Sequence, residues 1–204
     1  MSFQRAVAQL LAHEGGFVNH PADKGGATNW GITQATYERW KGRKVTVEEI
    51  RNMPVSDAHA IYKANYWDKF SGDQIRQYTM AYAIFDQAVN SGVSTAVARA
   101  QKIIGVPADG VMGSKTLAAL NAFAEPQFIS GYLAATKANY QNIVAKNPTQ
   151  EVFLKGWLNR VASLESYSLK NLGVSNEALI SAGLVITVAV IALLITAPRA
   201  KGIA

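Results

Sequence analysis

Apolar residues recur at helical spacing along most of this chain. In residues 3–13 they fall on one face of a helix, and Gly15-Gly16 provide the left-handed conformation that ends it. From 17 to 31 the periodicity gives way to Asn, Pro, Asp and Gly, which predicts a loop or a small hairpin. Helical spacing then returns. The pattern therefore predicts a mainly α fold with one small β element.

Capping residues mark where the following helices begin and end. Thr46 and Glu49 are spaced as a capping box, in which the two side chains satisfy backbone N–H groups at a helix start. Gly92 and Gly105 stand where two helices should end, because glycine adopts positive φ without a steric penalty. We expect helices over 33–40, from 46, over 56–67 with Ser56 as the cap, over 77–90, from 94 to 105, from 116, and over 126–146 and 149–172.

The C-terminal part of the chain has a different character. Residues 178–197 are twenty residues without a charge. As a helix they would span about 30 Å, the thickness of a hydrocarbon core. Glu177 precedes this segment, and Arg199 and Lys201 follow it. The pattern predicts a single transmembrane helix, whereas the apolar stretch at the N-terminus is too short and too amphipathic for a signal peptide.

Composition excludes several kinds of site. The 204 residues include no cysteine, so no disulfide framework and no thiolate metal site exists. His13, His20 and His59 are not spaced as metal ligands, and we expect neither a metal nor a cofactor. The formal net charge is +6, but no Lys/Arg run of the nucleic-acid-binding type occurs. A mild positive excess suits an anionic polymer, and it is also common among proteins that bind nothing charged.

One short stretch carries the groups that a glycosidase needs. Glu14 follows a predicted helix, where the negative end of the macrodipole disfavours the ionised carboxylate. Asp23 and Thr28 follow on a glycine-rich segment that a substrate can approach closely. Glycoside hydrolysis requires a protonated acid and a second carboxylate on the other side of the sugar. The alternatives are a solvated Glu, an Asp that caps a turn and a Thr that stabilises one.

The same stretch resembles a known family. Residues 14–19 (EGGFVN) and 21–33 (PADKGGATNWGIT) closely resemble the signature of glycoside hydrolase family 108. The family consists of N-acetylmuramidases, which occur as phage-type endolysins and as muramidases associated with protein secretion. The resemblance covers about residues 3–170. Its shorter matches are 61–67 (IYKANYW), 85–92 (FDQAVNSG) and 153–157 (FLKGW).

The resemblance implies a mainly α, lysozyme-like fold with a small β-hairpin or loop near the active site. It implies that Glu14 is the general acid for cleavage of the β-1,4 bond between N-acetylmuramic acid and N-acetylglucosamine. The order of Glu, Asp and Thr is similar to the catalytic triad of phage-type lysozymes, so Asp23 would place water or stabilise the cation, assisted by Thr28. The sequence departs twice from these patterns. The gap from Asp23 to Thr28 is one residue shorter, and Phe17 stands where the family often has Tyr.

Further side chains are candidates for contact with the glycan. Sugar rings stack on aromatic faces, although aromatics at helical spacing are more often core residues. Asp86 and Asn90 lie one turn apart on a predicted helix, where they would contact the sugar or stay buried with partners. Asp109 opens a D-G-x-x-G-x-x-T turn similar to that of wall-binding domains, a pattern that a tight turn between helices also explains. The expected substrate-binding residues are Trp30, Tyr62, Tyr66, Trp67, Asp86, Asn90 and Asp109.

We therefore expect a lysozyme-like catalytic domain in residues 1–92, a helical peptidoglycan-binding-like domain in 93–173, and a linker with one transmembrane helix in 174–204. This organisation predicts a single-pass protein of the bacterial inner membrane with its soluble part in the periplasm. The alternative is a cytoplasmic location until release through a holin or a secretion system. Peptidoglycan and the membrane are the expected partners, without nucleic acid. Two other functions fit the same residues, a lytic transglycosylase and a non-catalytic wall-binding membrane anchor.

Overall fold

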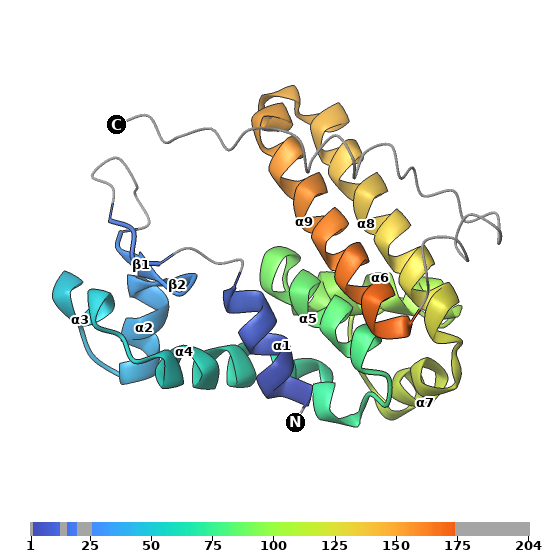
Figure 1. The fold of residues 1–204 in the computed structure, drawn as a ribbon, viewed down its shortest axis with the longest axis horizontal. Helices are drawn as coiled ribbons and strands as arrows, with labels where there is room; N and C mark the ends of the chain where they lie inside the picture. Colours follow the sequence, from blue (N-terminus) through green and yellow to red (C-terminus); the bar gives the residue numbers. More distant parts are fainter. Residues whose placement is uncertain (1, 13–15, 20–25, 174–204) are drawn as a thin grey trace. The chain divides into compact units, whose positions relative to one another are not determined.

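The protein is described by a computed structural model that covers residues 2–12, 16–19 and 26–173 (Figure 1). The chain separates into two compact units, residues 1–128 and 129–204. In the described residues both units are built from helices, apart from one small β-hairpin in the first. This agrees with the mainly α pattern and the small hairpin expected from the sequence.

The predicted fold class also included a C-terminal transmembrane helix, and this part is corrected. Among the described helices, none is both long enough and apolar enough to cross a membrane. The two longest, α8 (Glu125–Lys146) and α9 (Glu151–Leu172), have 22 residues each but carry polar and charged side chains along their length. Residues 178–197, where the span was expected, lie outside the described residues. The predicted inner-membrane location depended on that span, and nothing in the described part of the chain tests it.

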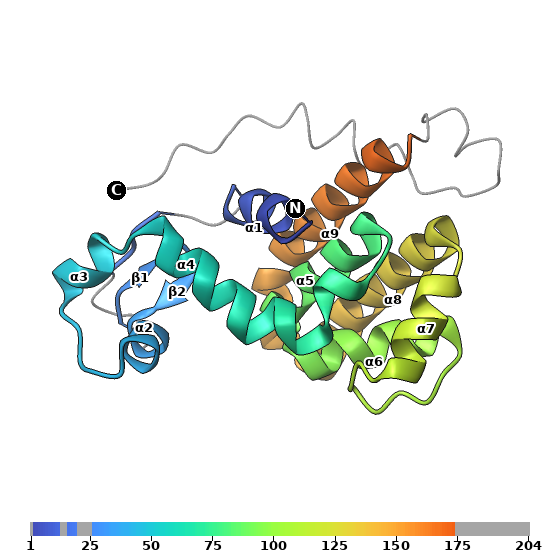
Figure 2. The same cartoon turned by 90° about the horizontal axis from the view of Figure 1, so that it is seen from below.

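The first unit begins with helix α1 (Ser2–Leu11) and the antiparallel strands β1 (Thr28–Asn29) and β2 (Ile32–Thr33). The helices that follow in chain order are α2 (Gln34–Lys41), α3 (Val47–Arg51), α4 (Val55–Tyr62), α5 (Tyr78–Ser91), α6 (Val93–Ile104) and α7 (Ser114–Ala122). Between α4 and α5 the chain makes a π-helical turn, η1 (Lys63–Trp67), and two 3₁₀ turns, η2 (Asp68–Phe70) and η3 (Gly72–Gln74). The second unit holds most of α8, a 3₁₀ turn η4 (Pro148–Gln150) and α9, and α8 and α9 form a helical hairpin (Figures 1 and 2).

Local signals predicted several of these boundaries. The capping box at the start of α3 is confirmed, because the Thr46 hydroxyl accepts from the N–H of Glu49 and the Glu49 carboxylate accepts from the N–H of Thr46. Gly105 ends α6 in the left-handed conformation, as expected. The predicted cap at Ser56 is wrong. Helix α4 begins one residue earlier, after Pro54, whose ring fixes φ at a value compatible with an extended helix-entry residue.

An aromatic cluster forms the core of the first unit. Trp67 is 0% exposed, and its ring centroid lies 5.6 Å from that of Phe3 and 5.5 Å from those of Phe70 and Phe85. Tilted and edge-to-face contacts of this kind add to the free energy gained by burying the rings. Helix α5 is buried over residues 79–88, as expected for a helix surrounded by other elements. The cluster therefore ties α1, the π-helical turn and α5 together.

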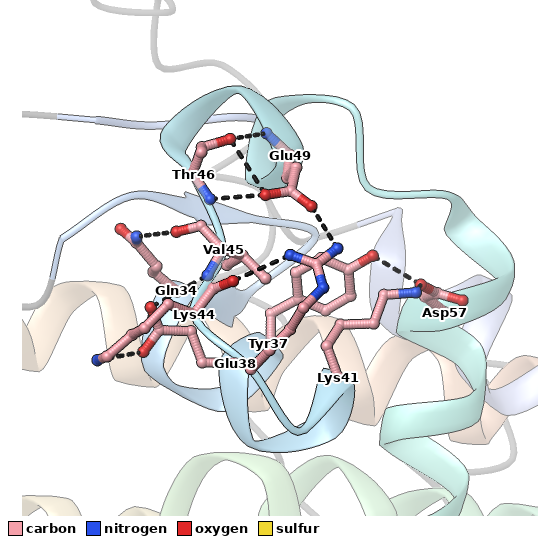
Figure 3. A network of polar contacts seen from close by, with 10 residues as sticks. Gln34, Tyr37, Glu38, Lys41, Lys44, Val45, Thr46, Glu49 and Asp57 are labelled. Carbon is pink, nitrogen blue, oxygen red and sulfur yellow. Dashed lines mark hydrogen bonds and ion pairs between the residues drawn. The ribbon is translucent and has the colours of Figure 1, made fainter.

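A polar network joins helices α2, α3 and α4 (Figure 3). Tyr37 donates its hydroxyl to Asp57 at 2.7 Å, and Lys41 forms an ion pair with the same carboxylate oxygen at 2.9 Å. The hydrogen bonds from Lys41 and then from Tyr37 hold the pKa of Asp57 below its ordinary value. Asp57 therefore anchors α4 to α2. The other ion pairs drawn in the network are Lys44–Glu38 at 2.8 Å and Arg43–Glu49 at 2.6 Å.

Replacing Asp57 with Asn is expected to lower the free energy of unfolding by about 1–2 kcal/mol at neutral pH, because the ionised acceptor of both bonds is lost. The folded pKa of Asp57 is lowered, so its stabilising effect is complete above its ordinary pKa and is lost as the pH falls through the folded value. Urea unfolding of both proteins at neutral and acidic pH measures this. The difference between them should narrow on acidification, and a constant or growing difference would contradict the role given to Asp57.

Candidate active site

The predicted catalytic residues lie in the part of the chain that runs from the end of α1 to the first strand of the β-hairpin. Glu14 and Asp23 lie outside the described residues, whereas Thr28 is the first residue of β1. The described residues that flank Glu14 and Asp23 along the chain belong to α1, to residues 16–19 and to the hairpin. Thr28 is therefore the predicted catalytic residue that the described structure contains.

The backbone of Thr28 is fixed from both sides. Its N–H donates to the carbonyl of Val18 and its carbonyl accepts from the N–H of Val18, both at 2.8 Å. On the other side Thr28 is the register partner of Thr33 in β2. Trp30 and Gly31 form the turn between the strands with φ of 52° and 73°, the left-handed values of a type I′ turn. This turn matches the strand twist, but it holds a bulky side chain in a conformation that non-glycine residues disfavour.

Side-chain hydrogen bonds attach the hairpin to the segment from α3 to α4. Asn29 donates through Nδ2 to the carbonyls of Ile50 at 3.0 Å and Arg51 at 2.9 Å. Trp30 donates through Nε1 to the carbonyl of Met53 at 3.3 Å. These bonds end on carbonyl groups in the last turn of the short helix α3 and just beyond it, where the carbonyls of a helix lack partners within the helix. The Ile50 carbonyl also accepts from the N–H of Met53 at 3.2 Å. The hairpin and the end of α3 are thus held as one piece.

Asn29 was not among the residues predicted from the sequence. It is 5% exposed, and its partners lie 21 and 22 residues away along the chain. A polar side chain at the inward position of a strand was its only signal. Because the partners are main-chain carbonyls, which every residue has, the sequence does not indicate which residues accept these hydrogen bonds.

The predicted aromatic residues divide into two groups. The Tyr62 hydroxyl donates to the carbonyl of Trp30 at 3.0 Å, which brings the end of α4 to the hairpin. The rings of Tyr62 and Tyr66 lie 5.8 Å apart between centroids, and Tyr66 and Trp30 are half-buried. Tyr62 and Trp67 are buried, so other protein groups cover their faces. The structure therefore brings Trp30, Tyr62 and Tyr66 together and places Trp67 in the core.

The π-helical turn carries a cluster of charges beside this core. Trp67 donates through Nε1 to Asp73 at 2.9 Å, and Lys63 forms ion pairs with Asp68 and, at 3.3 Å, with Asp73. The hydrogen bond from Trp67, followed by that from Lys63, lowers the pKa of Asp73. Single π-helical turns are frequent at functional sites. Within the described ranges, no group of three or more His, Asp or Glu side chains is placed to hold a metal ion.

Asp86 and Asn90 lie on one helix, as predicted, but differ in environment. Asp86 is buried, and its carboxylate accepts from Nε2 of Gln87 at 3.1 Å. Gln87 in turn accepts from Nη1 of Arg99 at 2.9 Å, which extends a buried polar chain from α5 to α6. Asn90 is exposed and donates to the main-chain carbonyl of Asp86 at 2.6 Å. The pair therefore does not present two polar groups to one open surface in this structure, and its contact with substrate stays a prediction.

The turn that begins at Asp109 is organised by Gln101. Nε2 of Gln101 donates to the Asp109 carboxylate at 2.7 Å and to the Thr116 hydroxyl at 3.2 Å, and its Oε1 accepts from the N–H of Gly110 at 2.8 Å. The hydrogen bond from Gln101, and then that from the N–H of Val111, lowers the pKa of Asp109. A Cβ at Gly110 would lie 2.2 Å from Oγ of Ser94, so the turn also requires a glycine there. These contacts account for Asp109, Gly110 and Thr116 of the D-G-x-x-G-x-x-T pattern, whereas a Cβ at Gly113 would meet nothing within 4 Å. A glycan contact at Asp109 stays a prediction.

Comparison with known proteins gives two adjoining matches. Residues 7–92 match the family described as Glycosyl hydrolase 108, and residues 95–162 match the Predicted Peptidoglycan domain. The solved structure of SagA from Brucella abortus is 40% identical to this chain, with a TM-score of 0.70, and the match covers 83% of this chain and 94% of that one. No curated protein matches.

These matches confirm the predicted family, the glycosidase class and peptidoglycan as a partner. They lend no support to the membrane, a holin or a secretion system as partners, and the predicted domain boundaries stay predictions. A similarity of this identity and coverage establishes the family. The chain therefore belongs to glycosyl hydrolase family 108, and it is a peptidoglycan hydrolase of the N-acetylmuramidase type that carries a peptidoglycan-binding domain.

Proposed function

We propose that Glu14 is the general acid of this N-acetylmuramidase and that Asp23 and Thr28 assist it. The reaction is hydrolysis of the β-1,4 bond between N-acetylmuramic acid and N-acetylglucosamine. The observation that carries the proposal is the family match over residues 7–92, which spans all three residues. Their order along the chain is similar to that of the phage-type lysozyme triad, with a gap from Asp23 to Thr28 that is one residue shorter.

The position of Glu14 after α1 favours a protonated carboxyl group. Helix α1 ends at Leu11, and the N–H of Ala12 still donates to the carbonyl of Ala8 at 3.1 Å. Unpaired carbonyl groups at a helix C-terminus give that end a partial negative charge, which disfavours a carboxylate nearby. A carboxyl group that keeps its proton near neutral pH is the acid that a glycosidic oxygen requires.

In the proposed reaction the proton of Glu14 moves to the bridging oxygen as the bond from that oxygen to the anomeric carbon breaks. The sugar left behind has oxocarbenium character, and the Asp23 carboxylate stabilises its positive charge. Water then adds to the anomeric carbon and gives up a proton to a carboxylate. Thr28 holds that water through its hydroxyl. The pairing of Thr28 with Val18 and Thr33 supports this role, because a group that positions water needs a fixed backbone.

The aromatic residues take two roles in this proposal. Trp30 and Tyr66 are half-buried and contact the sugar rings. Tyr62 and Trp67 are buried and act through packing, Tyr62 by holding the Trp30 carbonyl. The peptidoglycan-binding domain keeps the enzyme on its polymeric substrate, which raises the local concentration of glycan at the catalytic site.

Mass spectrometry of purified peptidoglycan digested by the wild-type chain tests the proposal. Hydrolysis leaves muramic acid at reducing ends and adds one water to each cleaved bond. A lytic transglycosylase would leave 1,6-anhydro ends without added water. Binding to the wall without any cleavage product would identify a wall-binding anchor. Reducing muramic acid ends support the proposal, and either of the other outcomes rejects it.

A further inference from the structure

Arg51 ends α3 with its guanidinium over the ring of Phe17, at 4.1 Å between Cζ and the ring centroid. We propose that Arg51 binds a carboxylate carried by the muramic acid unit of the substrate. This inference rests on the proposed function and adds to it a residue that recognises the charge of the substrate. Arg51 would then favour glycans that contain muramic acid over neutral ones.

Phe17 places the guanidinium close to the predicted chemistry. It follows Glu14 by three residues, so their Cα atoms are at most about 11 Å apart even in a fully extended chain. Phe17 also precedes Val18, the residue that pairs with Thr28. A cation stacked on Phe17 therefore lies next to the residue that pairs with Thr28, and three positions along the chain from Glu14.

The hairpin fixes the backbone from which Arg51 extends. Asn29 donates to the carbonyls of Ile50 and Arg51, and Trp30 donates to that of Met53. Asn29 is itself buried. The main chain of Arg51 is thus held at its carbonyl group. The ring of Phe17 contacts the guanidinium group through a cation–π interaction. A side chain held at both ends loses less conformational entropy when it binds a ligand.

Among the described residues, most of the N–H donors of Arg51 have no partner. Its only ion pair in the described part of the chain joins Nε to Glu48 at 3.3 Å, with the two side chains 53% and 69% exposed. Lys41, Lys44 and Arg43 have shorter ion pairs, at 2.9, 2.8 and 2.6 Å. Toward the described residues, Nη1 and Nη2 of Arg51 make no hydrogen bond. A guanidinium with two parallel donors matches a carboxylate in a two-pronged hydrogen bond.

The substrate offers such a carboxylate on one of its two sugars only. N-acetylglucosamine is neutral, whereas muramic acid carries a lactyl group with a carboxyl end. In intact peptidoglycan that carboxyl is joined to a peptide stem, which supplies carboxylates of its own. The shared chemistry is a carboxylate on the muramic acid side of the strand, from either the lactyl group or the stem.

The test compares Arg51→Gln with wild type on matched substrates. One is purified peptidoglycan, and the other is the same material after carbodiimide coupling to methylamine, which turns its carboxylates into neutral amides. Arg51→Gln should lower the initial rate at low substrate concentration about tenfold on the first substrate, the loss expected for a charge-assisted hydrogen bond. On the amidated substrate the two proteins should differ little. Glycan strands freed of stems by an amidase separate the two sources, since only the lactyl carboxylate remains on them.

Arg39→Gln is the matched control. Arg39 is exposed on α2 and donates to the Thr36 hydroxyl. Its substitution removes the same charge, and we expect no change in the rate on either substrate. Arg51→Lys keeps the charge without the two-pronged geometry and should recover part of the loss. An equal loss of rate on both substrates, or full activity of Arg51→Gln on the purified, unmodified peptidoglycan, overturns the inference. If wild type itself produces no reducing muramic acid ends, the proposed function fails instead.

Discussion

The Glu14→Gln variant is expected to hydrolyse peptidoglycan about 10²–10⁴-fold more slowly than wild type, or more slowly still. The amide has nearly the shape of the carboxylic acid but has no acidic proton to give to the glycosidic oxygen. The leaving sugar would then depart as an alkoxide, which raises the barrier. Release of reducing ends from purified peptidoglycan by wild type and variant measures the effect.

Two further measurements make this result specific. Glu151→Gln is the matched control, because Glu151 is an exposed residue of the second unit and the chemical change is the same. Its rate should equal that of wild type. Sedimentation with insoluble peptidoglycan should show that Glu14→Gln still binds the wall. Retained hydrolysis in Glu14→Gln would remove Glu14 from the role of general acid.

Trp67→Ala is expected to lower the free energy of unfolding by about 3–5 kcal/mol. The substitution empties a site packed by Phe3, Phe70 and Phe85, and it leaves the Asp73 carboxylate without its indole donor. A loss of this size should lower the melting temperature of the first unit by roughly 10 °C or more. Thermal and urea unfolding, followed by circular dichroism, measure it.

Trp40→Ala is the control for this prediction, because Trp40 is 42% exposed and its removal should cost far less. Gly72 gives a second check. A Cβ at Gly72 would lie 2.5 Å from Cδ2 of Trp67, so Gly72→Ala alone should destabilise the protein. In the Trp67→Ala background the same change should cost little, because the atoms that it meets are gone. Additive losses would show that the packing around Trp67 is not as described.

Sequence alone predicted the parts of the fold that depend on neighbouring residues. The Thr46–Glu49 capping box, the left-handed Gly105 and the long helices at α8 and α9 follow from residues within a few positions of one another. The turn of the hairpin follows from the break in periodicity before Gly31. Caps, helix ends and helices of this kind are determined by interactions between residues close in the sequence, so sequence patterns predict them.

Features that depend on distant contacts could not be predicted in this way. Trp30 and Trp67 both lie in stretches of sequence that resemble the family. Trp30 is nevertheless half-buried at a turn, whereas Trp67 lies in the core. The burial of Trp67 depends on Phe3 and Phe85, which are distant from it in the sequence. Likewise the two bonds of Asn29 end on main-chain atoms of α3, which have no sequence signature.

The left-handed Trp30 has a consequence for engineering this enzyme. At φ of 52° a large side chain costs roughly 1–2 kcal/mol that Gly or Asn would largely avoid. A library screened for heat resistance alone would thus tend to discard the indole at this position. Any such selection needs a parallel screen on whole cell walls, or it will remove the ring that we propose contacts the polymer.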